Sequence, residues 1–364
     1  MLLPWIVQGE KRMSMNGSKQ YSALVVGASG IIGNAVVREL QGRPDWTVRA
    51  LPRTFVEGVE TIKADLTDLE ATKAALSAAR DTTHVFYAAL KGGTDLLDEE
   101  RINGGMLRNL LDGLKSVGAP LQRVVHYQGA KVYGVHLGPT QAPFYEDDPR
   151  HMTPNFYYAQ EDLLRERAAA GEFEWSILRP DVVVGDIAGN PMNIVMVMGA
   201  FAALSREAGV PLRFPGPQNV YSGVLAQTTD SAWMARASVW AALDPAARGE
   251  AFNLVNEPFR WERIWRRVAA AFDMEVAPPQ PFSLAKQMPL KAEAWRRLAD
   301  RHGLRVPEID KVVGWWFGDF VFNTEFDMVS DMGKIRRAGF TEAVETEATI
   351  EAAIARLRAS KQLP

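Results

Sequence analysis

The sequence predicts an α/β protein with a doubly wound parallel sheet and a smaller, mainly helical C-terminal lobe. Short apolar segments alternate with helix-like segments from residue 22 to residue 179, as in parallel sheets that helices cover on both faces. A glycine loop joins the first apolar segment to the first helix-like segment. Strand-like alternation is nearly absent after residue 258, so that part is expected to be helical. Together these observations indicate a Rossmann-type fold with an added helical lobe.

The same alternation predicts each element in turn. The expected core strands are short and apolar, as strands buried on both faces are; they are residues 23–26, 46–51, 60–64, 84–88, 123–127 and 175–179. The expected core helices are residues 31–40, 69–79, 100–117 and 156–170, with a later helix at 228–243 that returns to the sheet. In the C-terminal lobe the expected helices are residues 261–272, 284–301, 308–318 and 347–360.

The length of 364 residues favours a core domain with a second lobe. Residues 1–20 precede the first strand and are interpreted as an N-terminal extension. Residues 21–190 form the expected NADP-binding Rossmann domain, and residues 220–255 return to it. The remaining segments, 191–219 and 256–364, form the expected substrate-binding lobe, which is therefore discontinuous.

Composition excludes several classes of function. With 41 basic and 44 acidic residues the net charge is −3, and no basic patch or arm indicates nucleic acid or an anionic membrane as partner. The chain has no cysteine, and its five histidines lack acidic or histidine neighbours at ligand spacing, so no metal site is expected. The longest apolar run, 194–204, is too short to span a membrane. A cytoplasmic location is the simplest expectation.

The loop after the first expected strand has the spacing of a dinucleotide-binding turn. Gly27 permits a sharp turn, Gly30 lets backbone N–H groups approach a pyrophosphate, and Gly33 lets the helix pack closely on the strand. The helix N-terminus then offers free N–H groups to phosphate. An ordinary glycine-rich turn is the alternative, but the strand and helix on either side favour a nucleotide site. The expected contacts are Gly27, Ser29, Gly30, Ile31, Ile32 and Gly33.

The residue after the second strand favours NADPH over NADH. An NAD enzyme places an acidic residue there to bind the ribose 2′-hydroxyl, whereas this chain has Arg53, whose guanidinium suits a 2′-phosphate. A solvated surface arginine is the alternative interpretation. Asp65 and Leu66 are expected beside the adenine, although Asp65 also fits as the N-cap of the next helix. Ala88, at the end of a later strand, is a further expected cofactor contact.

The Tyr-x-x-x-Lys pair of ordinary short-chain dehydrogenases is missing from its expected helix. Tyr127 and Lys131 have that spacing, but they follow a strand and enclose a glycine, so they do not share one helical face. The helix that begins after Asn155 has two adjacent tyrosines. Four residues after each of them stands an acid, Glu161 or Asp162, and not a lysine.

These features resemble the progesterone 5β-reductase and iridoid synthase-like family of atypical extended short-chain dehydrogenases. The resemblance runs from about Tyr21 to Pro364, and the segment Asn-Phe-Tyr-Tyr-x-x-Glu-Asp with a displaced lysine is its most specific part. The matching segments are Gly27 to Gly33, Thr83 to Tyr87, Gly129 to Lys131, Asn155 to Tyr158 with Glu161 and Asp162, Arg179-Pro180, Leu212 to Gly216, and Phe252-Asn253 followed by Asn256, Trp261 and Trp265.

The resemblance implies NADPH-dependent 1,4-reduction of the C=C bond of an enone or enal. It assigns Tyr158 and Lys131 as the catalytic pair that stabilises the enolate, with Tyr158 also beside the cofactor and Tyr157 as the alternative ring. Ala130 and Val132 depart from the plant pattern beside the lysine, so substrate preference does not follow from the resemblance. The implied substrate is a small hydrophobic enone, such as a steroid, a monoterpenoid or a small cyclic enone, and the resemblance leaves a homodimer open.

Five residues are candidates for the substrate pocket. They are Tyr133, Phe156, Met192, Met196 and Phe340. The methionines lie in an apolar stretch that fits a pocket wall or plain core packing equally well. Phe340 rests on a loose local match to an aromatic residue of the family.

Two other functions fit the same fold. A carbonyl reductase or nucleotide-sugar epimerase of the extended type is the enzymatic alternative, although an epimerase would normally carry the Tyr-x-x-x-Lys pair. A regulator that senses NADP(H) without turnover is an alternative of another class, and it would have no need of an intact Tyr158 and Lys131. Fold alone does not decide between them.

Overall fold

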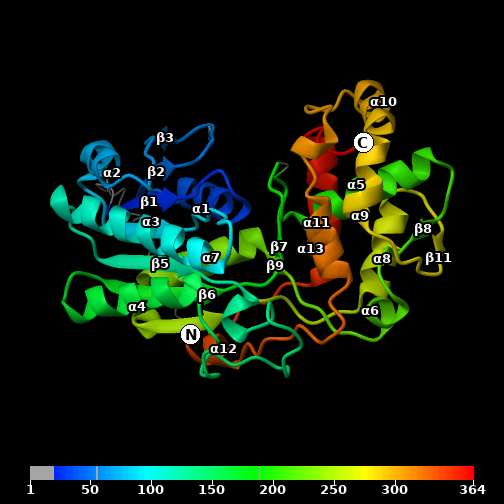
Figure 1. Ribbon diagram of the computed structural model, residues 1–364. Coiled ribbons are helices and arrows are strands. Elements are labelled where there is room, and N and C mark those ends of the chain that lie inside the picture. Colours follow the sequence, from blue (N-terminus) through cyan, green and yellow to red (C-terminus); the bar gives the residue numbers. More distant parts are fainter. Residues whose placement is uncertain (1–19, 55, 188) are drawn as a thin grey trace, which may run out of the picture.

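The structure, a computed structural model, describes residues 20–54, 56–187 and 189–364. All but the last residue of the expected N-terminal extension lie outside these ranges. Figure 1 shows two lobes: a sheet covered by helices, and a helical lobe that holds most of the C-terminal third of the chain. The short strands β7 (Val183–Val184) and β9 (Thr229–Asp230) lie between the lobes.

A seven-stranded sheet, parallel throughout, forms the core of the first lobe, in the order β10-β6-β5-β4-β1-β2-β3. Its strands are β1 (Tyr21–Val26), β2 (Trp46–Leu51), β3 (Glu60–Thr61), β4 (His84–Tyr87), β5 (Arg123–Tyr127), β6 (Glu174–Arg179) and β10 (Glu250–Asn253). The helices of this lobe are α1 (Ile31–Gln41), α2 (Leu69–Leu76), α3 (Leu96–Ser116), α4 (Phe156–Ala169), α7 (Ser231–Leu243) and α12 (Gly333–Arg337). The predicted fold class is confirmed.

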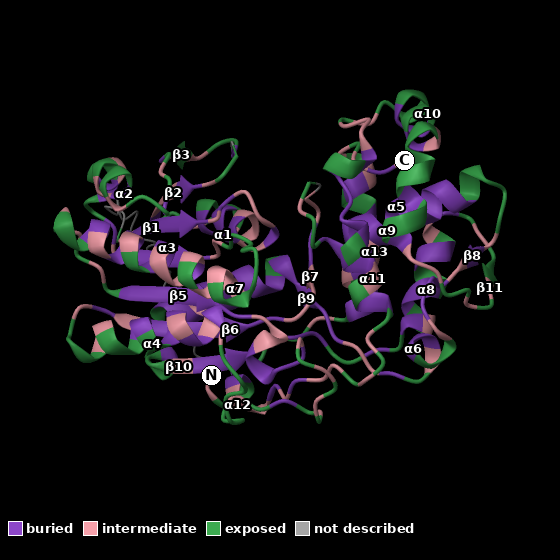
Figure 2. Ribbon diagram, viewed as in Figure 1, coloured by how far each residue is buried: buried purple, intermediate pink, exposed green. Residues whose placement is uncertain are grey.

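The helical lobe has its own apolar core around α5 (Ile194–Glu207), whose first twelve residues are all buried. The other helices of this part of the chain are α6 (Gln218–Ser222), α8 (Trp261–Ala271), α9 (Leu284–Gln287), α10 (Ala292–His302), α11 (Trp315–Phe322) and α13 (Thr346–Ala359). A small pair, β8 (Leu212–Arg213) with β11 (Val276–Ala277), is also present. Figure 2 shows the buried faces of these helices turned toward one another.

Several predicted elements differ in detail from the structure. The predicted helix at 284–301 is broken into α9, a 3₁₀ turn and α10, because Pro289 lies inside that stretch. The helix predicted from residue 100 begins at Leu96, where the Asp95 side chain accepts a hydrogen bond from the Asp98 N–H. Strand β10 was not among the predicted strands.

Helix α7 packs on α1 and on the sheet, so the chain returns to the first lobe after α5. Within the described part of the chain, no helix is long and apolar enough to cross a membrane.

Candidate functional site

The carboxyl ends of four neighbouring strands bring the candidate residues to one edge of the sheet. The glycine loop follows β1, Ala88 follows β4, Gly129 follows β5 and Asp181 lies just past β6. Since β1, β4, β5 and β6 are adjacent in the sheet, these four points form a row. Ligands of doubly wound sheets bind along this edge.

The glycine loop packs closely on its surroundings and offers hydrogen-bond donors for a phosphate group. Gly27 has φ +80°, and a Cβ there would lie 2.6 Å from the carbonyl carbon of Ala88; a Cβ on Gly33 would lie 2.4 Å from the Gly27 oxygen. Gly30 is the N-cap of α1 and, having no side chain, makes no capping hydrogen bond. The first turn of α1 contains no acidic residue. The N–H groups of that turn, which includes Ile31 and Ile32, are therefore free for an anion.

Arg53 lies exposed just beyond β2, and its guanidinium makes no hydrogen bond or ion pair with any described residue. Asp65 does not cap the next helix, because its carboxylate accepts hydrogen bonds from the Thr67 N–H and hydroxyl, at 2.9 and 2.6 Å. The N-cap of α2 is Asp68. Leu66 is buried, and its carbonyl accepts a hydrogen bond from Asn109.

The Tyr158 hydroxyl, which the sequence predicts to act together with Lys131, is bonded to backbone groups in the structure. The Tyr158 hydroxyl donates to the Val132 carbonyl at 2.7 Å and accepts from the His151 N–H at 2.9 Å. Its ring lies in a small buried cluster with Val132 and Phe144. Both backbone contacts use the polar end of the side chain, so Tyr158 ties the segment before α4 to the segment after β5.

Tyr157 is the tyrosine that faces the strand edge. Its hydroxyl lies 3.2 Å from the position of a Cβ on Gly129, at the end of β5. Burial raises the pKa of Tyr157 to about 12; the Gly129 N–H opposes this, and the nearby carboxylates of Glu99 and Asp181 add to it. The Tyr157 hydroxyl therefore keeps its proton throughout the neutral pH range and is available as a hydrogen-bond donor.

Lys131 lies over the ring of Phe156, the neighbour of Tyr157, and is held by an ion pair. Its ammonium is 2.9 Å from Glu99, in the first turn of α3, and 5.4 Å from the centre of the Phe156 ring. Phe156 in turn contacts Tyr157, with ring centres 4.1 Å apart. The backbone of Lys131 is fixed by Asn155, whose side chain donates to the Lys131 carbonyl at 2.9 Å. The structure thus groups Lys131, Glu99 and Tyr157.

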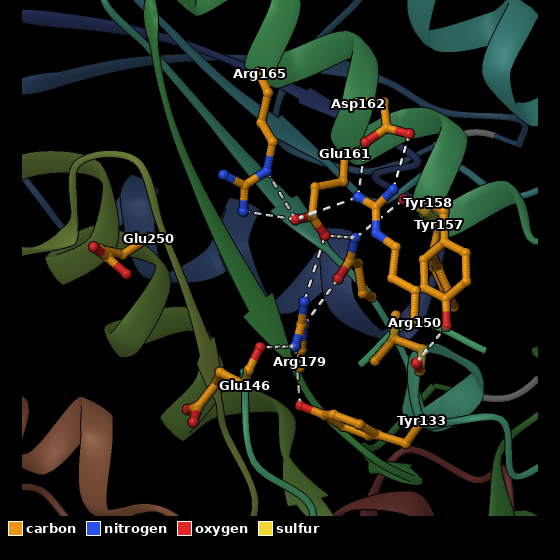
Figure 3. Close-up of polar contacts among 12 residues, drawn as sticks. Tyr133, Glu146, Arg150, Tyr157, Tyr158, Glu161, Asp162, Arg165, Arg179 and Glu250 are labelled. Carbon is orange, nitrogen blue, oxygen red and sulfur yellow. Dashed lines mark hydrogen bonds and ion pairs between the residues drawn. The ribbon is translucent and has the colours of Figure 1, made fainter. Parts of the chain in front are cut away.

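The acid that replaces the usual lysine has a structural role. Glu161, four residues after Tyr157, is buried and lies 3.4 Å from the Arg179 guanidinium, at the end of β6 (Figure 3). It also accepts two hydrogen bonds from Arg165, at 3.0 and 2.8 Å, and one from Gln128 at 3.2 Å. Arg179 donates to the other end of Gln128 at 2.9 Å. A lysine at this position would face an arginine in a buried setting.

Three of the five predicted pocket residues lie in packed cores or networks. Met196 is fully buried within the helical lobe. Phe340 packs between Trp233 and Trp240 on the sheet side of the first lobe, and Tyr133 stacks on Phe144 while its hydroxyl contacts Asn253 and Arg179. These placements correct their prediction as pocket residues. Phe156 does lie beside Lys131, and Met192 is exposed.

Residues 43–364 match the family described as the PRISE-like Rossmann-fold domain. The chain belongs to this family. The predicted family resemblance is therefore confirmed, and with it the prediction that the chain is an oxidoreductase.

Curated relatives of this PRISE-like chain are plant enzymes. It is 32% identical to a (S)-8-oxocitronellyl enol synthase of Camptotheca acuminata, over 95% of this chain and 94% of that one. It is also 32% identical to the 3-oxo-Delta(4,5)-steroid 5-beta-reductase of Arabidopsis thaliana, over 87% of each chain.

Solved structures resemble the PRISE-like chain in fold. A UDP-glucose 4-epimerase of Thermus thermophilus, in complex with NAD, superposes with a TM-score of 0.64 at 18% identity, over 93% of this chain and 99% of that one. A GDP-L-fucose synthetase of Naegleria fowleri, bound to NADP, gives a TM-score of 0.65 at 16% identity, over 95% of both chains. At these identities the likeness establishes the fold alone.

The sequence pattern did not indicate some residues of the PRISE-like site. Glu99 and Asp181 are ordinary acids in their local patterns, and only the fold places them beside Tyr157. The indole of Trp316 is 53% exposed on α11 and lines a hollow of about 300 Å³, together with Gly189 and Pro191 from the loop after β7. The same loop reaches the glycine turn, since the Asn190 amide lies 3.8 Å from the position of a Cβ on Gly30.

Proposed function

We propose that this PRISE-like protein reduces the C=C bond of an enone or enal with NADPH, by 1,4-addition. The observation that carries the proposal is the Tyr157 hydroxyl, a protonated donor at the carboxyl edge of the sheet, grouped with the Lys131 ammonium. A relative named a 3-oxo-Delta(4,5)-steroid 5-beta-reductase supports the reaction class. The proposed substrate is a small hydrophobic enone.

The residues along the strand edge fit a dinucleotide. The free N–H groups at the start of α1 would hold the pyrophosphate, and the unpaired Arg53 guanidinium would hold the 2′-phosphate. Bound NADPH supplies the hydride that the β-carbon of the enone receives. Gly27 lets the loop pack closely on the end of β4, and Gly33 lets α1 pack closely on the loop, which fixes these N–H groups in place.

Reduction places negative charge on the carbonyl oxygen of the substrate, because the electron pair of the C=C bond moves to form an enolate. Tyr157 donates a hydrogen bond to this oxygen and remains protonated, since its pKa is about 12. One such donor in a site shielded from water is worth about 3–4 kcal/mol of transition-state stabilisation. Lys131 adds positive charge, partly balanced by Glu99.

The experiment is oxidation of NADPH by the wild-type protein with 2-cyclohexen-1-one and with progesterone, followed by identification of the products. Saturated ketones support the proposal. Allylic alcohols would identify a carbonyl reductase instead. Tight binding of NADPH without consumption of any enone would favour the NADP(H)-sensing regulator.

Replacing Arg53 tests the choice of cofactor. Arg53→Ala is expected to raise KM for NADPH about tenfold or more, because it removes a charge-assisted contact, while KM for NADH stays unchanged. Arg43→Ala is the matched control, since Arg43 is paired with Glu39 on the surface of α1. Equal changes in KM for NADPH and KM for NADH would show that Arg53 does not bind the 2′-phosphate.

Because Lys131 and Glu99 form an ion pair, substitutions at these two positions are expected to have coupled effects on kcat. Lys131→Met is expected to lower kcat about tenfold or more, because it leaves the Glu99 carboxylate unbalanced beside the developing enolate. The double variant Lys131→Met/Glu99→Gln is expected to be faster than Lys131→Met, since it removes that repulsion. Steady-state kinetics of wild type, both single variants and the double variant provide the measurement. A double variant slower than Lys131→Met would contradict the arrangement.

A further inference from the structure

Asp181, at the strand edge one residue past Pro180, has a carboxyl group that forms no ion pair with any described residue. Its Oδ1 accepts the Val182 N–H at 2.8 Å, and its own N–H donates to the Thr229 hydroxyl at 3.2 Å. Among the described residues, no side chain pairs with the second oxygen, Oδ2. Asp181 as a whole is half-buried, so the residue is not enclosed in the protein interior. The backbone thus fixes the residue while one carboxyl oxygen stays free.

The surroundings of Asp181 favour proton exchange near neutral pH. Burial raises the pKa of Asp181 to about 6, and the Val182 N–H only partly opposes this. Asp181 also interacts electrostatically with Tyr157 on α4, whose pKa its negative charge raises. A second carboxylate also acts on this tyrosine, that of Glu99 on α3, which forms an ion pair with Lys131. Asp181 has no cationic partner among the described residues.

Enone reduction needs a proton at the α-carbon as well as a donor at the oxygen. Tyr157 is placed to bind the enolate oxygen, and its pKa of about 12 means that it keeps its proton. A second acid is therefore needed to complete the saturated product. A carboxyl group with a pKa near the working pH is well suited to general acid catalysis.

We propose that Asp181 is the general acid that protonates the α-carbon of the enolate. The inference rests on the proposed function. In this step the O–H bond of the Asp181 carboxyl breaks, and the electron pair of the enolate C=C bond forms the C–H bond at the α-carbon. A lone pair of the enolate oxygen re-forms the C=O bond of the saturated ketone or aldehyde. Asp181 is left as a carboxylate and regains its proton from water. NADPH is the reductant for the preceding hydride addition.

The test uses 2-methyl-2-cyclohexen-1-one, whose reduction creates a stereocentre at the α-carbon. Wild type is expected to give one enantiomer of 2-methylcyclohexanone in excess at early times. Asp181→Asn keeps the size of the side chain and the acceptor for Val182, so it is expected to fold and to bind NADPH as wild type does. It is expected to lower kcat about tenfold or more and to give nearly racemic product, because water then protonates the enolate from either face.

The pH profile gives a second readout with a defined sign. The acid form of Asp181 is lost as the pH rises through about 6, so kcat of wild type is expected to fall over that range and that of Asp181→Asn to stay flat. Asp162→Asn is the matched control, because Asp162 lies exposed on α4 and pairs with Arg150. If Asp181→Asn kept the wild-type rate and enantiomeric excess, the role of Asp181 would be overturned while enone reduction stood. If wild type formed no saturated ketone, both proposals would fail.

Discussion

Tyr157→Phe is expected to lower kcat/KM for enone reduction about a hundredfold or more, because it removes the donor that stabilises the enolate oxygen. The binding of NADPH should be unchanged, since the glycine loop and Arg53 are not touched. Steady-state kinetics with 2-cyclohexen-1-one and a fluorescence titration with NADPH provide the two measurements.

Tyr158→Phe is the matched control for that experiment. It removes the hydrogen bonds to the Val132 carbonyl and from the His151 N–H. The free energy of unfolding is therefore expected to fall by about 1–2 kcal/mol, while kcat/KM stays close to the wild-type value. A large loss of activity in Tyr158→Phe, with Tyr157→Phe unaffected, would restore the pair first predicted from the sequence.

Glu161→Lys is expected to destabilise the protein strongly, although it restores the Tyr-x-x-x-Lys spacing with Tyr157. The new ammonium would lie beside Arg179 in a buried setting and would remove the acceptor of Arg165 and Gln128. Breaking a buried ion pair in this way costs about 3–5 kcal/mol, because a charge is left unpaired. Chemical denaturation measures the change.

Asp162→Lys is the control for Glu161→Lys, because its side chain is exposed on the same helix. It is expected to change the free energy of unfolding by less than about 1 kcal/mol. If Glu161→Lys were as stable as this control and more active than wild type, the Glu161 network would not explain why the family position lacks a lysine.

The order of strands and helices in the first lobe could be predicted because apolar runs and the glycine loop report local geometry. Strand β10 was not predicted because its four residues show no alternation of apolar and polar side chains. They form a strand because they pair with β6. Pro289 indicates the break in the predicted helix at 284–301. The helical periodicity on either side of it nevertheless favoured one continuous helix.

The two tyrosines show where prediction of the site ends. Adjacent residues on an α-helix point about 100° apart, so Tyr157 and Tyr158 face different surroundings, and the sequence does not say which one meets the strand edge. The partners of Lys131 and Phe340 are likewise set by tertiary packing. Glu99 lies 32 residues before Lys131, and Phe340 lies about a hundred residues after the tryptophans that cover it.

The most direct measurement is reduction of 2-cyclohexen-1-one by NADPH that carries deuterium at the transferring position of its nicotinamide ring, with NMR analysis of the product. 1,4-Reduction predicts cyclohexanone with deuterium at the β-carbon and none at the carbonyl carbon. Deuterium on the carbinol carbon of 2-cyclohexen-1-ol would contradict it, because hydride would then have added to the carbonyl group.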